Sequence, residues 1–390
     1  MAKSVGGSGL RQIQDGEARL RRIVTVAAIV WASFVTLSGP TLAAEKAAPT
    51  AFKAPRNSVG QPDLSGIWSN ASLTRETRPP ALGNRRAYTA EEVAKLESEV
   101  VRKIEEGNAD IDPSTPAPKV GGETPAGTRP ESAAAAGGVG GYDRGWLEPG
   151  STVMRVAGEP RTSFVTTPNG QVPPRKGAPA GRGLRGMGSF DSYEYRSLGE
   201  RCILSFGRNA GPPMFPNGFY NNNYQFVQTA DSFVILVEMV HDTRIVRLNG
   251  SHRTDGIRPW MGDSIGHWEG DTLVVETTNI PSQQGYRGSW EHLTVTERFT
   301  RVGKSRVLYQ FTFDDPTSWD SPWGGEYEFA PLGGAIYEYA CHEGNYALPG
   351  ILSGARYEEA EAAKAKAEAA EKSKTESSAA AALKTKPPKT

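Results

Sequence analysis

The chain has 390 residues, and its 44 Lys and Arg balance its 44 Asp and Glu, so the formal net charge is zero. A neutral chain offers no electrostatic basis for binding nucleic acid or an anionic membrane surface. Without residues 1–43 the chain still carries 39 basic and 42 acidic side chains, so its near-neutrality does not depend on the N-terminus. We therefore expect no nucleic-acid partner.

The N-terminus joins a basic segment, an apolar run and a small-residue site. The first 22 residues carry five basic and two acidic side chains, and residues 23–38 are uncharged. Gly39-Pro40 and then Thr41-Leu42-Ala43 follow, an order typical of a secretory signal peptide. The apolar run of roughly 16 residues is short for a membrane span, which needs about 20, although a retained anchor is the alternative. We predict a signal peptide over residues 1–43 and a periplasmic or secreted protein without an integral membrane span.

The remaining chain divides by composition. Residues 44–61 form a polar leader, residues 62–356 a single β-rich domain, and residues 357–390 a solvated tail rich in Ala, Glu and Lys. Thr89 and Glu92 form a capping box, so we expect one N-terminal helix over 89–106. Residues 107–141 have almost no large apolar side chain. We expect this insert to be disordered, and the tail to be disordered or helical in part, since it has nothing to bury.

Short apolar runs separated by turns fill the core of the domain, residues 193–354. We expect nine strands, which are 224–228, 233–240, 244–248, 265–269, 272–278, 293–302, 307–314, 326–329 and 335–342. Thr229–Ser232 and Gly270-Asp271 separate strands as hairpin turns, and Asn249-Gly250 is a strong turn signal. Regular spacing with little intervening helix favours consecutive antiparallel pairing. The predicted fold is therefore mainly β, an antiparallel meander forming a closed or strongly curled, lipocalin-like barrel.

Cys202 and Cys341 are the two cysteines of the chain. In an oxidising compartment, two cysteines far apart in sequence indicate one disulfide bond. It would close a loop of about 140 residues, worth about 4–5 kcal/mol on the chain-entropy model. The alternative is a metal site using Cys341 and His342, but no second close pair of ligands accompanies it. We predict the disulfide and no metal.

Several segments resemble a family of exported bacterial proteins whose activity is uncharacterised. The matching segments are Pro62–Trp68, Leu198–Cys202, Gly211–Met214, Tyr220–Gln225, Gly262–Asn279 and Tyr337–Tyr346. The resemblance covers most of residues 52–356, and the long insert and the tail depart from it. It implies an exported, single-domain β protein and supplies no reaction.

Four carboxylates share strand faces with apolar residues, because side chains alternate between faces along a strand. They are Glu238, Glu276, Glu297 and Glu338. A carboxylate turned into a barrel lumen would have a raised pKa suited to acid or base catalysis. The alternatives are buried pairs with Arg244, Arg298 or Arg201, or a face assigned the wrong way round.

Histidine and amide side chains complete the set of candidates. His241 and His342 lie at predicted strand ends, where an imidazole could exchange protons near neutral pH, or bind a metal together. Asn222 and Asn223 offer hydrogen bonds to a polar ligand, or they structure a loop that covers the barrel. Trp268 could line an apolar cavity or simply pack in the core.

These residues support three hypotheses. The first is an extracytoplasmic enzyme, a lyase, isomerase or hydrolase, acting on a small organic molecule by acid–base chemistry. His241, His342, Glu238 and Glu297 would be catalytic, and Arg244, Asn222, Asn223 and Trp268 would bind substrate. The second is a lipocalin-like binding protein without turnover, and the third is an envelope-associated structural protein. The sequence indicates no cofactor and does not define the oligomeric state.

Overall fold

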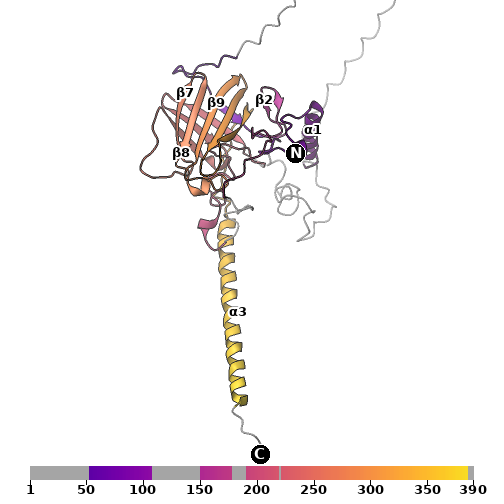
Figure 1. Cartoon of the computed structure of the whole chain (residues 1–390), viewed down its shortest axis with the longest axis vertical. Helices are drawn as coiled ribbons and strands as arrows, with labels where there is room; N and C mark the ends of the chain where they lie inside the picture. The colour runs from indigo at the N-terminus through magenta and orange to yellow at the C-terminus, as the bar shows by residue number, and fades with distance from the viewer. Residues whose placement is uncertain (1–51, 108–149, 178–189, 219–220, 385–390) are drawn as a thin grey trace, which may run out of the picture. The chain divides into compact units, whose positions relative to one another are not determined.

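The computed structural model describes residues 52–107, 150–177, 190–218 and 221–384. Within them, nine strands form a closed barrel in the order β1-β11-β10-β9-β8-β7-β6-β5-β4 (Figure 1). The strands are β1 (Gly66–Ser69), β4 (Asn223–Gln228), β5 (Ser232–Val237), β6 (Thr243–Leu248), β7 (Asp263–Glu269), β8 (Thr272–Thr278), β9 (Thr294–Gly303), β10 (Arg306–Asp314) and β11 (Trp323–Pro331). The predicted mainly β barrel is confirmed.

Neighbouring strands pair antiparallel, with one exception. β1 closes the barrel by pairing with β4 on one side and with β11 on the other. The exception is β6, which pairs parallel with β7 through Arg247 and Leu248. The expectation of uniformly antiparallel pairing was therefore wrong at this point. A long connection, residues 249–262, replaces the tight hairpin that Asn249-Gly250 suggested.

The ninth barrel strand is β1, whereas we expected a strand over 335–342. That segment forms no strand and belongs to an extended connection, residues 332–346, which we call the strap. A closed barrel leaves no free edge for it, since β1 already occupies the place between β11 and β4. The strap is held instead at Leu332, whose N–H donates to the Ile67 carbonyl at 3.0 Å, and at Cys341.

Two helices lie outside the barrel in the described part of the chain. Helix α1 spans Ala90–Gly107, and its capping box is confirmed, because the Thr89 N–H donates to Glu92 and the Glu92 N–H to the Thr89 hydroxyl. Helix α3 spans Ala347–Lys384, so the expected tail is helical over residues 357–384. Its described side chains from residue 357 onward are exposed, as a solvated tail requires. The predicted insert from residue 108 lies outside the described residues.

Short elements connect these parts. A two-stranded sheet joins β2 (Arg155–Val156) to β3 (Glu159–Pro160). The 3-10 helices are η1 (Pro80–Leu82), η3 (Tyr193–Tyr195), η4 (Met239–His241) and η5 (Ser282–Gln284). No helix in the part of the chain that the structure describes is long and apolar enough to cross a bilayer.

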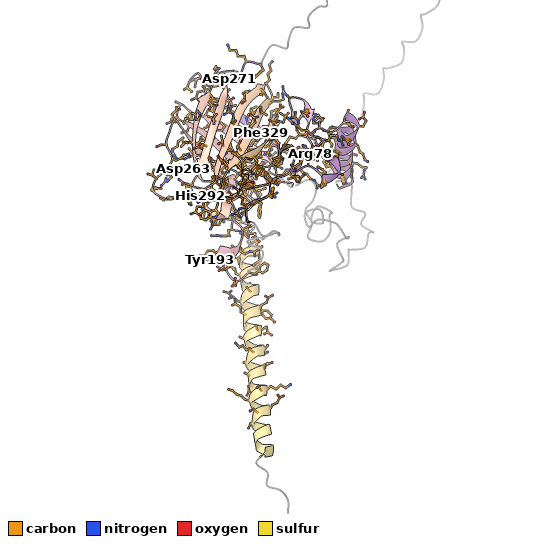
Figure 2. All side chains as sticks on the ribbon, in the orientation of Figure 1. Arg78, Tyr193, Asp263, Asp271, His292 and Phe329 are labelled. Atoms are coloured by element: carbon orange, nitrogen blue, oxygen red, sulfur yellow. A yellow bond between two sulfur atoms is a disulfide. The ribbon has the colours of Figure 1, made fainter. Side chains whose placement is uncertain are left out.

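Aromatic rings fill the barrel interior because every second strand residue points inward. Phe226, Phe233 and Phe299 form a cluster with ring centroids 5.3–5.7 Å apart, mostly edge to face. Phe329 joins it at 5.3 Å from Phe226 and lies among the barrel strands in Figure 2. Such edge-to-face contacts suit the ring quadrupoles. The lumen is therefore a packed core.

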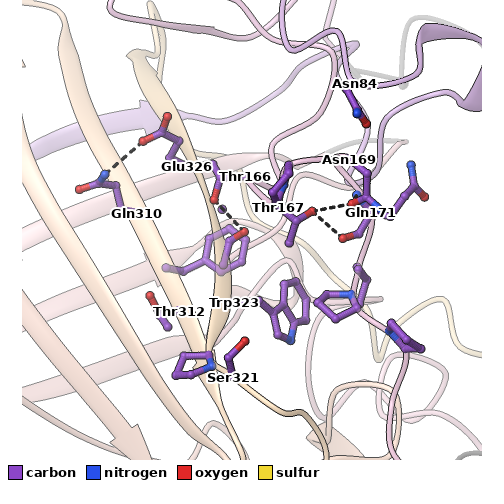
Figure 3. Close-up of a pocket in the computed structure, with 18 of the residues that line it drawn as sticks. Asn84, Thr166, Thr167, Asn169, Gln171, Gln310, Thr312, Ser321, Trp323 and Glu326 are labelled. Carbon is purple, nitrogen blue, oxygen red and sulfur yellow. Dashed lines mark hydrogen bonds between the residues drawn. The ribbon is translucent and has the colours of Figure 1, made fainter.

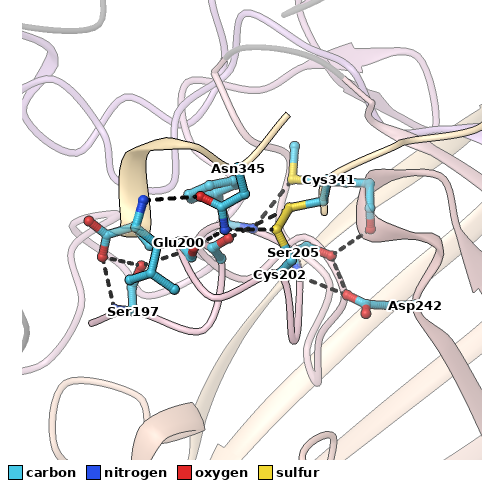
Figure 4. The surroundings of a disulfide bond; sticks show 11 residues. Ser197, Glu200, Cys202, Ser205, Asp242, Cys341 and Asn345 are labelled. Atoms are coloured by element: carbon cyan, nitrogen blue, oxygen red, sulfur yellow. Dashed lines mark hydrogen bonds between the residues drawn. A yellow bond between two sulfur atoms is a disulfide. The ribbon is translucent and has the colours of Figure 1, made fainter. Parts of the chain in front are cut away.

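The predicted disulfide is confirmed. Cys202 and Cys341 are bonded, and their Cα atoms lie 5.7 Å apart (Figure 4). The bond ties the segment before β4 to the strap. Beside it, the Asn345 side chain donates to the Glu200 carbonyl at 2.8 Å, which adds a second link between the same two segments.

Candidate functional site

A buried ion pair occupies the lumen. Arg244 on β6 donates both terminal nitrogens to Glu297 on β9, at 2.5 and 2.8 Å, and the two side chains are 2% and 0% exposed. The Tyr309 hydroxyl donates to the same carboxylate at 2.7 Å. Glu297 therefore faces inward as predicted, but its partner is Arg244, one of the pairings that we had considered. This pair leaves Arg244 no free bidentate edge for a substrate.

A segment of the chain plugs one end of the lumen. We call residues 208–215 the plug segment. The Met214 N–H donates to the Tyr309 hydroxyl at 2.9 Å, and the Tyr327 hydroxyl donates to the Met214 carbonyl at 2.8 Å. Burial raises the pKa of Tyr309 and Tyr327 well above the ordinary value, so both phenols stay neutral. The inner tyrosines thus anchor the plug segment.

Arg208 begins the plug segment and has no carboxylate partner in the described chain. Its guanidinium donates to the Gln284 carbonyl at 2.9 Å and to the Pro212 carbonyl, and it lies 5.5 Å from the centroid of the Tyr286 ring. Part of the side chain reaches solvent, but surrounding atoms enclose the charged group, and this burial lowers its pKa to about 10. Two carbonyls and a ring face therefore stabilise this cation.

The end of β5 differs from the predicted strand. The strand stops at Val237, and its buried face carries Phe233, Ile235 and Val237. The prediction had placed Glu238 on the buried face of this strand, which is the opposite face. Glu238 directly precedes the tight turn η4, in which Val240 has the left-handed φ of 60°. A β-branched residue rarely adopts that conformation. Glu238 is nevertheless buried, because the turn folds it under the strap.

Glu238 holds two segments together. Its carboxylate accepts from the Asn223 amide at 2.7 Å and from the Tyr337 N–H of the strap at 2.9 Å. Asp242, which the sequence reading missed, is buried close by and accepts from the Ser205 N–H and hydroxyl at 2.7 and 2.6 Å (Figure 4). Burial raises the pKa of Asp242. These contacts fix the turn and the strap.

The predicted histidines do not join this cluster. His241 and His342 are both exposed. Within the described chain, neither imidazole forms a hydrogen bond or an ion pair. The two histidines therefore contact neither each other nor the carboxylates of Glu238 and Glu297 through such bonds. No group of three or more His, Cys, Asp or Glu that could hold a metal occurs among the described residues.

The remaining candidates also have structural surroundings. Asn222 is fully buried, and its side-chain oxygen accepts from the Asn217 N–H at 2.9 Å. Trp268 is partly buried against the core. Glu276 and Glu338 are exposed, so their assignment to buried faces was wrong. The residues predicted to form one site are thus distributed over the lumen, the strap and the surface.

Asp263, at the start of β7, is a buried carboxylate with many donors. It accepts from Arg247 at 2.7 Å, from the Arg253 N–H at 2.8 Å and from His252 at 3.0 Å. Burial by itself would raise the pKa of Asp263, but the donors, led by Arg247, outweigh it and lower the pKa to about 2. The carboxylate therefore fastens the connection 249–262 to β7.

We expect Asp263 to make the free energy of unfolding depend on pH in the acidic range. Because the folded state prefers the ionised form, its contribution is present above the unfolded pKa of about 4 and is lost as the pH falls towards 2. The shift corresponds to about 2 kcal/mol. Asp263→Asn should therefore lower the free energy of unfolding by about 2 kcal/mol at pH 7, measured by urea denaturation, and should flatten its decline between pH 4 and 2. Asp271→Asn, at the exposed β7–β8 turn, is the control; an equal loss there would contradict the assignment.

A groove of about 870 Å³ lies outside the lumen (Figure 3). One wall is the outer face of β9, β10 and β11, and the other is the segment 166–174. That segment is pinned to β11, because the Thr166 N–H donates to the Gly324 carbonyl at 3.0 Å and the Glu326 N–H to the Phe164 carbonyl at 2.8 Å. Glycine at 325 permits this approach, since a Cβ there would overlap the Phe164 carbonyl oxygen, while a Cβ at Gly324 would overlap the Phe311 carbonyl oxygen of β10. The volume lies in the range of small-molecule sites, about 300–1,000 Å³.

Neutral polar side chains make up eight of the nineteen residues that line the groove. They are Asn84, Thr166, Thr167, Asn169, Gln171, Gln310, Thr312 and Ser321. Asn84, Thr312 and Ser321 form no side-chain hydrogen bond within the described chain, and they are exposed. Sequence reasoning missed the groove, because segment 166–174 has no periodic pattern and carries none of the motifs associated with a site. Comparison of the chain with models of protein families, with curated proteins and with solved structures found no match.

Proposed function

We propose that the protein binds a small molecule, without turnover, in the groove on the outer face of β9–β11. The groove itself carries the proposal: it has the volume of a ligand site, and Asn84, Thr312 and Ser321 offer it neutral donors and acceptors that no group of the described chain occupies. The lumen, by contrast, is filled by aromatic side chains and the Arg244–Glu297 pair. Lipocalin-like binding inside the barrel is therefore the less favoured position for the ligand.

The binding function is favoured over the enzyme hypothesis by the charges of the groove. Its two ionisable side chains, Arg298 and Glu326, are both engaged by other residues of the chain. His241, His342 and Glu238 do not line it. A groove without an available acid or base is suited to recognition, since proton transfer needs a titratable group within hydrogen-bond reach of the substrate.

We also propose that the protein acts outside the cytoplasm. The basic, apolar and small-residue order of residues 1–43 supports export. The Cys202–Cys341 bond supports it too, because stable disulfides are rare in reducing compartments.

Blocking the groove should abolish ligand retention. Thr312 is exposed on the groove wall, so Thr312→Trp places an indole where the ligand would lie. We expect native mass spectrometry of the exported protein to show a co-purified small molecule that Thr312→Trp lacks, and incubation to return that molecule unchanged. Ile245→Trp, at an outward position on β6, is the matched control and should retain it. Equal retention by both variants, or conversion of the molecule, would contradict the proposal.

A further inference from the structure

The charged residues of the groove are neutralised within the chain. Arg298 donates to Glu269 at 2.8 Å. Glu326 pairs with Arg161 and also accepts from the Gln310 amide at 3.1 Å (Figure 3). A charged ligand would lose hydration without gaining a free counter-charge, which is costly. These pairings therefore favour a neutral ligand.

The unoccupied polar groups are both donors and acceptors. The hydroxyls of Thr312 and Ser321 and the amide of Asn84 can each donate and accept. Trp323 also lines the groove, but its indole N–H is buried and is not counted among these groups. A purely apolar ligand would take water away from these exposed side chains without replacing its hydrogen bonds, which is costly. The ligand must therefore carry acceptors as well as hydroxyl-like donors.

The apolar part of the lining consists largely of proline rings, with Pro173, Pro174 and Pro322 among them. These rings offer flat aliphatic surface between the polar groups. A saccharide has the complementary construction, with hydroxyls around the edge of each ring and C–H groups on its faces. An extended peptide fits less well, because it would seek a free strand edge, and β11 is already paired with β10 and with segment 164–166.

We infer that the ligand of the groove is a neutral oligosaccharide of a few rings. This inference rests on the proposed binding function and names its ligand class. The hydroxyls of the sugar bind Thr312, Ser321 and Asn84, and its C–H faces lie on the proline rings. The self-paired charges make the groove selective against acidic and amino sugars.

The test is titration calorimetry of the full exported chain with defined trisaccharides. The probes are neutral trisaccharides of glucose and of N-acetylglucosamine, a uronic acid trisaccharide, a glucosamine trisaccharide and a proline-rich peptide. We expect a neutral trisaccharide to bind at least tenfold more tightly than either charged one. Binding of a charged sugar or of the peptide in preference, lost in Thr312→Trp, would overturn the saccharide inference while leaving the groove as the binding site.

Point variants locate the contacts. Thr312→Val keeps the shape of the side chain and removes its hydroxyl, and Ser321→Ala removes the second. We expect each to weaken the neutral trisaccharide about three- to tenfold, whereas Thr243→Val on the exposed face of β6 has no effect. Trisaccharide binding that Thr312→Trp and Thr312→Val leave unchanged would overturn the inference, and retention of the co-purified molecule by Thr312→Trp would overturn the groove proposal itself.

Discussion

Glu297→Ala is expected to lower the free energy of unfolding by about 3–5 kcal/mol, because it leaves a buried arginine without its counter-charge. Arg244 is 2% exposed and Glu297 is the acceptor of both its terminal nitrogens. The substitution also removes the acceptor of the Tyr309 hydroxyl. The measurement is urea denaturation at neutral pH, with the midpoint shifting at constant slope. A loss no larger than that of Glu269→Ala, which breaks an exposed pair with Arg298, would contradict this role.

The double variant Arg244→Met/Glu297→Leu separates the charge from the packing. It removes both buried charges and fills the space with apolar side chains, and such replacements are often neutral or stabilising. We therefore expect it to recover most of the stability lost in Glu297→Ala. A double variant as unstable as the single one would show that the hydrogen bond to Tyr309, and through it the anchoring of the plug segment, carries the loss.

The alternation of side chains predicted the barrel well where strands are long. In β9, Val295, Glu297 and Phe299 fall on one face, and all three are buried. The turns at Thr229–Ser232 and Gly270-Asp271 separate the strands that they were expected to separate. The alternation is informative here because a strand of seven to ten residues contains several repeats of the two-residue period. In β5 the pattern was ambiguous, since Phe233, Ile235 and Val237 alternate with the equally apolar Val234 and Leu236.

Strand pairing decided what local pattern could not. The four-residue strand β1 and the strap both have short mixtures of polar and apolar residues, and the choice between them depends on which one closes the barrel. The groove depends on distant segments in the same way, because segment 166–174 meets the outward residues of β10 and β11 only in the folded chain. Single residues such as Thr312 carry no signal for such a site until the two walls are in place.

Removing the disulfide is expected to cause the second large loss in the free energy of unfolding. We also expect the strap to lose more of its local stability than the barrel does. Cys202 and Cys341 are 139 residues apart, and on the chain-entropy model a loop of that length contributes about 5 kcal/mol to stability. We expect Cys202→Ala/Cys341→Ala to lose about 4–5 kcal/mol, measured by urea denaturation. Either single variant breaks the same bond and should lose a similar amount.

The distribution of the loss distinguishes a local from a global effect. Without the bond, the strap keeps the Leu332 N–H on the Ile67 carbonyl, the Tyr337 N–H on Glu238 and the Asn345 amide on the Glu200 carbonyl. The barrel strands keep their full ladders of backbone hydrogen bonds. Hydrogen exchange should therefore accelerate first over residues 332–346, and the groove should keep its ligand, because its walls on β9–β11 and segment 166–174 do not depend on the strap. Barrel amides that exchange through global unfolding should accelerate only by the loss that urea denaturation reports. Equal acceleration of the strap and the barrel would instead place the disulfide in the cooperative core of the fold.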